Sequence, residues 1–389
     1  MPLLTPSEAA LIARRVYLLR EDKVSESRER GRRFGTEGKF TLDDTSTFKA
    51  ESGALAWKQA SGFGYVAWGE GEHKNEVLVV ARGTAVAVDW LTNLNIGTRL
   101  GPAGWPVHAG FMETWKSFSA VLDPLLRGRH PTHIHCVGHS LGGALAALTA
   151  DWATANRVAP VSLYTFGAPR CGDAVFSSAL TRRVGAANVY RVYHPADIVP
   201  MIPMLPFFHS PLPGHGLRLN TGSAALFSVA AHHMEDSYMA GVAGRSWQGM
   251  AGGAGNGVSD SAQAQSFLEA AAQGQGSFLM GSAKLLHMIG RALAWLLRKA
   301  AWLMGSVLGG PASAGLTLMD QLAWVLAQSA QISKEVAGHV KALMGAILGF
   351  LGRKTTAVAD VTQAFVRWLL ATLISTLTAI AQRALAQLG

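Results

Sequence analysis

The sequence predicts an α/β fold with a largely parallel sheet, followed by a region made only of helices. Short apolar stretches typical of buried strands alternate with helical patterns in roughly the first 240 residues. From about residue 281 onward only helical patterns remain. Because the 389 residues exceed the length of an ordinary single domain, two domains are expected.

The chain begins with an amphipathic pattern that predicts a helix starting near Thr5 or Ser7, both residue types that cap helices. The apolar core of a secretory signal is missing from it, so synthesis in the cytoplasm without a signal peptide is expected. A glycine-containing strand stretch at 61–71 precedes a strong strand at 76–84, "EVLVVARGT". A helix with aromatic spacing follows at 107–126.

The stretch "HIHCVGHSLGGALAALTA" passes from a predicted strand, 133–137, to a predicted helix, 141–157, with Ser140 at the junction. Gly138 and Gly142 flank this serine in a G-x-S-x-G pattern. Glycines at these positions remove the side chains that would collide in so sharp a turn. The pattern predicts a nucleophile elbow, which exposes the serine oxygen at the end of the sheet.

A serine hydroxyl needs a base to become a nucleophile, and the base needs an acid to orient it. Two further strands are predicted at 161–166 and 188–193, and Asp197 follows the second of them. Ligand sites of such sheets lie at the carboxyl ends of the strands, so Asp197 is the expected acid. The base is expected later in the chain, where His232 and His233 stand side by side.

The oxyanion that forms during acyl transfer needs backbone N–H donors in a pocket that excludes water. Leu141, directly after the candidate nucleophile, supplies one donor. Thr84, the last residue of the stretch 76–84, where the strand passes into the following loop, supplies a second N–H and a hydroxyl.

Five blocks of this sequence, in order and at ordinary spacing, resemble the class 3 lipases, the fungal-type α/β-hydrolase family that also has bacterial members. The resemblance covers about residues 65–240. The blocks are "VLVVARGT" with "DWLTNLNIG", "VHAGFMETW", "VGHSLGGALAALTA", "YTFGAPRCGD" and "YHPADIVPMIP".

The resemblance implies the α/β-hydrolase fold, with Ser140 as the nucleophile, Asp197 as the acid, and Thr84 with Leu141 as the oxyanion hole. The family often places a tyrosine five residues after the catalytic histidine. Tyr238 lies five residues after His233, so His233 is the predicted base and the neighbouring histidine remains the alternative.

In the family the segment after the oxyanion turn forms a lid over the acyl pocket, which corresponds here to the apolar residues 85–96. The resemblance implies no cofactor and no metal. His133 and His135 share one face of a strand, but no carboxylate or third histidine at ligand spacing accompanies them. Strand packing is therefore expected for both histidines rather than a metal site.

Three parts of the chain are predicted: a lipase-like domain at 1–245, a linker rich in Gly, Ala, Ser and Gln at 246–280, and a basic, apolar helical domain at 281–389. The helical patterns in the last part cover 281–308, 315–331, 332–351 and 355–387.

The formal net charge is +9, and from residue 281 onward Lys and Arg exceed Asp and Glu by seven. Basic, apolar helices fit a membrane surface, a bundle packed on itself, or an acidic partner protein. Zinc-finger spacing and helix-turn-helix signals are missing, so nucleic acid is not an expected partner. Expected partners are lipid substrate, the membrane surface, and an inhibitor, immunity or chaperone protein that covers the helical tail.

The leading hypothesis is a serine lipase or phospholipase that cleaves carboxylic esters of membrane lipids. A signal-less lipase domain joined to a basic helical tail resembles bacterial effector lipases, so export by a signal-independent route such as type VI secretion is a further hypothesis. Two alternatives remain: a catalytically silent lipase fold that only binds, and a membrane-disrupting protein whose tail is the active part.

Overall fold

The computed structural model describes the ranges 3–21, 34–42, 47–52, 59–83, 97–219, 226–251, 260–273, 282–304, 318–353 and 361–386. The chain divides into two compact units. The first, the α/β unit, comprises Met1–Gly222, Ser228–Ala254 and Ala381–Gly389. The second, the helical unit, comprises Ser223–Phe227 and Gly255–Ile380.

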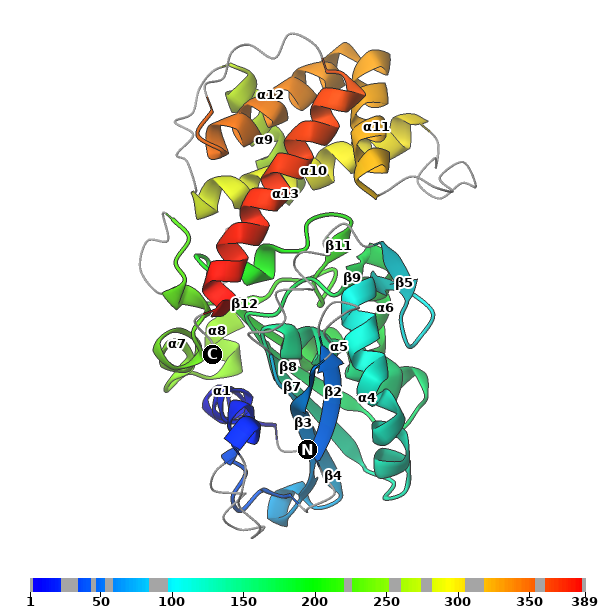
Figure 1. The fold of residues 1–389 in the computed structure, drawn as a ribbon, viewed down its shortest axis with the longest axis vertical. Helices are drawn as coiled ribbons and strands as arrows, with labels where there is room; N and C mark the ends of the chain where they lie inside the picture. The colour runs from blue at the N-terminus through cyan, green and yellow to red at the C-terminus, as the bar shows by residue number, and fades with distance from the viewer. Residues whose placement is uncertain are drawn as a thin grey trace. The chain divides into compact units, whose positions relative to one another are not determined.

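In its described residues, the α/β unit contains an eight-stranded main sheet and a second sheet of four short strands (Figure 1). The strands of the main sheet are β1 (Phe40–Thr41), β2 (Thr47–Ser52), β3 (Gln59–Gly69), β4 (Glu76–Ala81), β7 (His133–His139), β8 (Val161–Phe166), β10 (Val189–Tyr193) and β12 (Leu217–Arg218). The strands of the second sheet are β5 (Thr98–Leu100), β6 (Pro106–His108), β9 (Gly172–Asp173) and β11 (Phe207–Phe208).

The main sheet has the order β1-β3-β4-β7-β8-β10-β12, and β2 also pairs with β3. The pairs from β4 to β12 are all parallel, whereas β3 pairs antiparallel with its neighbours. The predicted, largely parallel α/β fold is therefore confirmed. Because β4, β7, β8 and β10 run in the same direction, their carboxyl ends meet at one edge, where the chain leaves β7 at Ser140.

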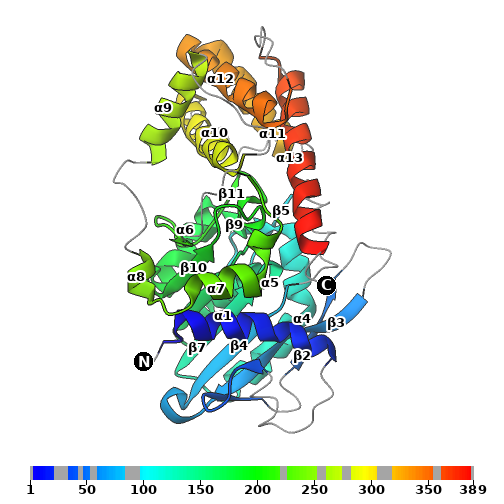
Figure 2. The same cartoon turned by 90° about the vertical axis from the view of Figure 1, so that its left-hand side faces the viewer.

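Helices cover both faces of the main sheet (Figure 2). One face is covered by α1 (Pro6–Arg15), α7 (Ala240–Val242) and α8 (Trp247–Ala251), and the other by α4 (Ala109–Arg127), α5 (Leu141–Ala155) and α6 (Ala174–Val184). The predicted N-terminal helix starts as expected, because Thr5 accepts from the backbone N–H of Glu8 while the Glu8 carboxylate accepts from the N–H of Thr5.

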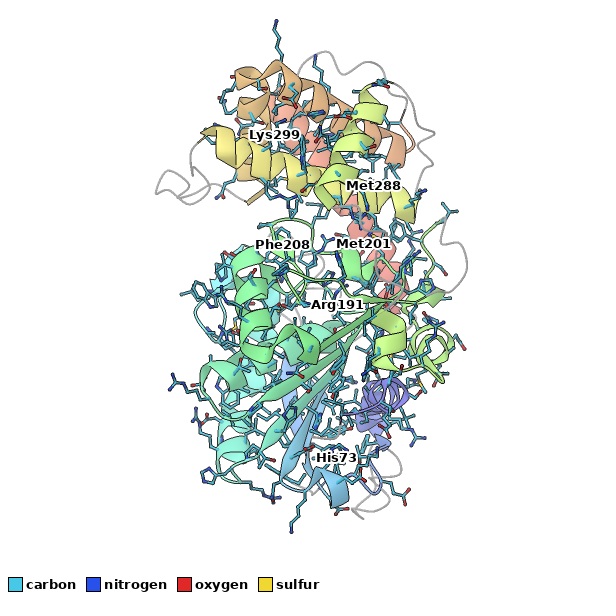
Figure 3. The ribbon with its side chains drawn as sticks, turned by 180° about the vertical axis from the view of Figure 1, so that it is seen from behind. His73, Arg191, Met201, Phe208, Met288 and Lys299 are labelled. Carbon is cyan, nitrogen blue, oxygen red and sulfur yellow. The ribbon has the colours of Figure 1, made fainter. Side chains whose placement is uncertain are left out.

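Short turns complete the α/β unit and place several of its polar side chains. The 3₁₀ turns are η1 (Val16–Glu21), η2 (Gly71–His73), η4 (Ala186–Asn188), η5 (Val199–Met201) and η6 (Ala230–His232). A π-helical turn, η7 (Met234–Met239), follows η6. His73, at the end of η2, lies just before β4 (Figure 3).

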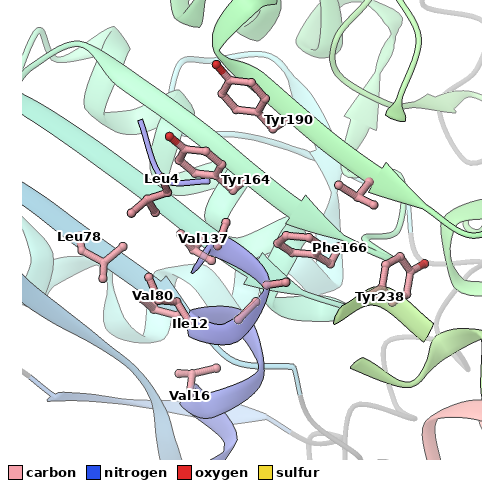
Figure 4. Packing of buried hydrophobic residues seen from close by; sticks show 14 of the residues in the cluster. Leu4, Ile12, Val16, Leu78, Val80, Val137, Tyr164, Phe166, Tyr190 and Tyr238 are labelled. Atoms are coloured by element: carbon pink, nitrogen blue, oxygen red, sulfur yellow. The ribbon is translucent and has the colours of Figure 1, made fainter. Parts of the chain in front are cut away.

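The apolar core on the α1 side of the sheet includes residues from Leu4 near the N-terminus to Met250 of α8. Figure 4 shows the part of this core around the first helix and the central strands. Ile12 and Val16 of the first helix and turn pack with Val80, Val137 and other side chains of the central strands. Every residue of β4, β7 and β8 is buried, as expected for parallel strands covered on both sides.

The helical unit contains five helices in its described part. They are α9 (Asp260–Ala272), α10 (Ala283–Met304), α11 (Leu318–Ile332), α12 (Lys334–Phe350) and α13 (Gln363–Ala386), the last of which ends within the residues assigned to the α/β unit. The four helices predicted from the sequence correspond to α10–α13. Among the described residues, one segment, Gln363–Leu385, is long and apolar enough to span a membrane, with a mean hydropathy of 1.7 and 39% of its most apolar window buried.

The stretch 246–280 contains two helices, α8 and α9, where the composition predicted a linker. The glycines lie mainly at 249–257 and 274–276, whereas the residues between them are rich in alanine. Alanine, glutamine and glutamate favour helices. The composition of the whole stretch therefore resembles a linker, although its alanine-rich middle part forms α9.

Candidate active site

The candidate nucleophile lies at a strained junction between β7 and α5. Ser140 has φ +57° and ψ −133°, a conformation that non-glycine residues rarely adopt. Its backbone N–H donates to the carbonyl oxygen of Phe166 on β8, at 3.0 Å, which ties the turn to the neighbouring strand. The sequence prediction of a sharp strand-to-helix elbow at Ser140 is confirmed.

The two flanking glycines are required by close backbone contacts. A Cβ atom on Gly138 would lie 2.1 Å from the carbonyl oxygen of Gly142, and a Cβ on Gly142 would lie 2.2 Å from that of Ala81. Both distances are far below any real carbon–oxygen contact, and the obstructing atoms are backbone. Glycine at these positions therefore lets β4, β7 and α5 meet closely enough to form the turn.

Ser140, His232 and Asp197 form a continuous relay. The Ser140 Oγ lies 3.0 Å from His232 Nε2, and His232 Nδ1 lies 2.7 Å from Asp197 Oδ2. Since an ionised carboxylate only accepts hydrogen bonds, Nδ1 carries the proton and Nε2 is free to accept from the serine hydroxyl. All three side chains are fully buried. This is the geometry of nucleophile, base and orienting acid.

The prediction of His233 as the base is wrong in this structure, which places its neighbour His232 in the relay. The error comes from the turn that follows. η7 is π-helical, and the N–H of Tyr238 donates to the carbonyl of His233 five residues earlier, at 3.3 Å. A π turn holds one residue more than an α turn, so the relay histidine is six residues before Tyr238. The Nε2 of His233 is buried and has no hydrogen-bond partner.

Asp197 follows β10 and is held from two sides. Its Oδ1 accepts the backbone N–H of Val199 at 2.9 Å, and its Oδ2 accepts the hydroxyl of Tyr238 at 2.6 Å. Burial, the nearby Asp197 charge and this hydrogen bond together raise the pKa of Tyr238 well above its ordinary value. Tyr238 therefore remains a donor at neutral pH and fixes the carboxylate that orients His232.

A second histidine, His139, supports the backbone of the relay histidine. Its Nε2 lies 3.0 Å from the carbonyl oxygen of His232, and its Nδ1 lies 2.8 Å from the hydroxyl of Tyr17 in η1. Burial lowers the pKa of His139 well below its ordinary value. The imidazole is thus neutral, with its proton on Nε2 toward the carbonyl, and Nδ1 accepts from the tyrosine.

These two supporting residues were not identified from the sequence. His139 occupies the variable position of the G-x-S-x-G pattern, and Tyr17 is 122 residues away along the chain. No local pattern links them.

The expected oxyanion site is described only in part. Leu141 is the first residue of α5, directly after Ser140, as predicted. A Cβ atom on Gly83 would lie 3.0 Å from the Cβ of Ser140, so the chain passes close to the nucleophile as it leaves β4. Thr84 and the predicted lid, 85–96, lie outside the described residues.

One cluster of metal-ligating side chains is found in the described part of the chain, and it lies at the opposite end of β7. His73, Glu76 and His135 are all buried, and their ligand atoms lie within 4.8 Å of one another. Glu76 and His73, which lie beside His135 in this cluster, come from β4 and the turn before it, so ligand spacing around His133 and His135 did not indicate them.

Residues 78–207 match the model of the class 3 lipase family. The chain is 36% identical over 140 residues to secreted mono- and diacylglycerol lipase 1 of Fusarium solani, covering 34% of this chain and 41% of that protein. It is 30% identical over 250 residues to phospholipase A1-II 1 of Oryza sativa subsp. indica, covering 55% of this chain and 62% of that protein. The predicted resemblance is therefore confirmed, and the chain spans less than two thirds of the length of either relative.

Solved structures of fungal lipases are also similar in part. One is a nonglycosylated LIP2 lipase of Yarrowia lipolytica, with a TM-score of 0.44 and 20% identity over 56% of this chain and 79% of that one. Another is lipase II of Rhizopus niveus, with a TM-score of 0.41 and 24% identity over 56% of this chain and 80% of that one.

Proposed function

We propose that this chain, whose residues 78–207 match the model of the class 3 lipase family, is a serine hydrolase that cleaves carboxylic esters of lipids. The observation that carries the proposal is the relay from Ser140 Oγ to His232 and on to Asp197, at 3.0 and 2.7 Å. The strained conformation of Ser140 adds to it, because the turn aims the hydroxyl at the base.

The first half of the reaction forms an acyl-enzyme. The Oγ of Ser140 attacks the ester carbonyl carbon while Nε2 of His232 takes the hydroxyl proton. The carbonyl oxygen becomes an oxyanion, which the backbone N–H of Leu141 stabilises. When the tetrahedral intermediate collapses, the bond to the alcohol oxygen breaks and His232 gives its proton to the leaving alcohol.

The second half regenerates the enzyme. A water molecule attacks the acyl carbon as His232 removes one of its protons, and the serine leaves with that proton as the carboxylic acid is released. Asp197 remains ionised throughout and stabilises the protonated imidazole that forms in both steps.

The proposed substrates are acylglycerols or glycerophospholipids. The support comes from the relatives, which are named as a mono- and diacylglycerol lipase and as a phospholipase A1. Product analysis on vesicles that contain both lipid classes distinguishes the two. Free fatty acid with lysophospholipid indicates phospholipase activity, whereas free fatty acid with shortened acylglycerols indicates lipase activity.

Labelling of the full chain with a fluorophosphonate probe tests the proposed mechanism. The wild type is expected to react, and Ser140→Ala and His232→Ala are expected to lose the label. His233→Ala is the matched control, since it removes the adjacent imidazole, and it should still label. Failure of the correctly folded wild type to label would identify the chain as a silent lipase fold that only binds.

We also propose that the helical region acts at membrane surfaces. Its excess of seven basic residues and the apolar segment Gln363–Leu385 support this role. Trp368, which is 42% exposed, supplies an aromatic side chain of the type that favours the membrane interface. Vesicle leakage measured with Ser140→Ala separates two mechanisms: leakage that persists comes from the helices, and leakage that disappears comes from lipid hydrolysis.

The biological role that we propose is that of an exported antibacterial effector, with an immunity or chaperone protein covering the basic helices. The support is the combination of an ester-hydrolase site with a basic helical region in one chain. If this role is correct, targeting the chain to the periplasm of a susceptible bacterium should stop growth, and Ser140→Ala should restore it. A gene without secretion or immunity genes nearby would argue against the role.

A further inference from the structure

The amino ends of β4 and β7 hold a polar cluster that the proposed reaction does not use. Glu76 begins β4 and lies opposite His133 of β7. His135 is two residues further along β7, so its side chain is on the same face of the sheet as that of His133. His73 comes from η2, three residues before Glu76. Ser140 is five positions after His135, about 16 Å along an extended strand. The cluster is therefore too far from the Ser140 hydroxyl to take part in the proposed ester cleavage.

The Glu76 carboxylate joins two of these histidines through one oxygen. Its Oε2 lies 2.7 Å from Nδ1 of His73 and 2.9 Å from Nε2 of His135. The exposed fractions of these three residues do not exceed 3%. Burying a carboxylate away from water is costly unless it is hydrogen-bonded or paired with a cation. Here the buried carboxylate lies between two imidazoles, and side chains of these two types are common ligands of metal ions.

We propose that His73, Glu76 and His135 bind a divalent transition metal that stabilises the fold, with Zn²⁺ as the best-fitting ion and a water molecule as its fourth ligand. Two imidazole nitrogens and one carboxylate oxygen are ligands that zinc prefers. In a tetrahedral zinc site, neighbouring ligand atoms lie about 3.3 Å apart, given bonds of about 2.0–2.1 Å. The observed contacts would thus lengthen by only roughly half an ångström to admit the ion.

The surroundings of the cluster match those of metal-bound histidines. The other ring nitrogen of His135, Nδ1, faces the hydroxyl of Tyr164 at 3.4 Å, and such outer contacts orient a ligating imidazole. The ring of Phe40 lies over the cluster, 4.8 Å from His73 and 5.8 Å from His135 between centroids. Burial lowers the pKa of His135 to about 4, so its imidazole is neutral at neutral pH, and Nε2 is freed to bind an ion when its proton moves to Nδ1, which faces Tyr164.

The ion has a short path to the site, because His73 lies in a turn at the surface. Its neighbours Glu72 and Lys74 are both exposed, although His73 itself is buried. Figure 3 shows His73 at the end of the α/β unit opposite to Met201 and Phe208. A metal there would tie the turn before β4 to the centre of the sheet and stabilise the fold.

Isothermal titration of the full, metal-stripped chain with ZnCl2 tests the site. We expect saturable binding near one ion per chain and a rise in the thermal midpoint of unfolding when Zn²⁺ is added. Co²⁺ in place of zinc should give the visible absorption bands of a tetrahedral site. Glu76→Gln and His73→Gln preserve hydrogen bonding and are each expected to weaken binding about tenfold or more.

Two control variants make the result specific. His215→Ala removes an exposed histidine, and His232→Ala removes the imidazole of the catalytic relay, so both should bind zinc as the wild type does. The proposal is overturned if the folded wild type shows no saturable binding, or if both cluster variants bind as tightly as the wild type. None of these readouts depends on hydrolysis, so the result is independent of the proposed function.

Discussion

Tyr238 and His232 donate to the same carboxylate oxygen, Oδ2 of Asp197, at 2.6 and 2.7 Å. The tyrosine is fully buried and stands at the end of the π-helical turn that follows the relay histidine. Two consecutive turns, η6 and η7, therefore carry the two donors, and the carboxylate of Asp197 is held between them. The orientation of this carboxylate depends on the register of both turns.

Tyr238→Phe should lower kcat about tenfold to a hundredfold with little change in KM. A hydrogen bond to a charged group contributes roughly 1.5–3 kcal/mol, and this bond orients the base through Asp197 rather than touching substrate. Steady-state hydrolysis of a soluble short-chain ester measures the effect. Tyr190→Phe, which removes a hydroxyl elsewhere in the same core, is the control and should leave kcat unchanged. Equal losses in both variants would contradict a specific role for Tyr238.

Tyr17→Phe should weaken both stability and activity, because it leaves Nδ1 of His139 without the hydroxyl that faces it at 2.8 Å. An unsatisfied buried acceptor costs about 1–3 kcal/mol. The imidazole holds the carbonyl of His232 through its other nitrogen, so a shift of the ring displaces the base. Urea unfolding and ester hydrolysis measured on the same preparation check this. A variant with wild-type kcat and lowered stability would assign Tyr17 to folding alone.

The elbow and the acid could be predicted from the sequence because their signals are local. Glycines two residues on either side of Ser140 report a backbone constraint that any chain must obey at that turn. Asp197 is predicted by its place just after a strand, at the edge where parallel strands end. The packing of α1 could also be predicted in outline, since the capping residue and apolar spacing are both in the sequence.

The base and the polar cluster could not be predicted, for two different reasons. The choice between His232 and His233 depends on one extra residue in a π turn, which amphipathic spacing does not encode. His73 and Glu76 meet His135 only through the pairing of β4 with β7. That contact joins segments about 60 residues apart in sequence, so no ligand spacing within one segment could reveal it.

The free energy of unfolding of the metal-free chain should fall as pH decreases from about 6.5 to 4. The pKa of His135 is about 4 in the fold and 6.5 when unperturbed, so in this window the unfolded chain binds a proton that the fold excludes. Stability therefore increases with pH, and this residue contributes roughly 3 kcal/mol across the window.

Glu76 acts in the same direction. Burial raises its pKa, but hydrogen bonds from His135 and His73 outweigh burial and hold the pKa below its ordinary value. The stabilisation that Glu76 gives the fold is fully present above its unfolded pKa and is lost as the pH falls through its lower pKa in the fold. Urea titrations of the wild type and His135→Gln at several pH values measure both effects. The variant should lose most of the slope between pH 6.5 and 4, and an identical slope would show that other groups control acid unfolding.

Gly142→Ala should abolish the native elbow, whereas an alanine elsewhere on a helix should be harmless. The added Cβ would lie 2.2 Å from the carbonyl oxygen of Ala81, and relief requires β4 and α5 to separate. We expect the free energy of unfolding to fall by more than about 3 kcal/mol, within the range of severe core overpacking and strain, and fluorophosphonate labelling to be lost.

Gly290→Ala in α10 is the matched control, since a Cβ atom added there would meet nothing within 4 Å. Alanine there should stabilise by about 0.5–1 kcal/mol through helix propensity. A folded, reactive Gly142→Ala protein would mean that the close approach of these backbones is not needed to hold Ser140 in its strained conformation.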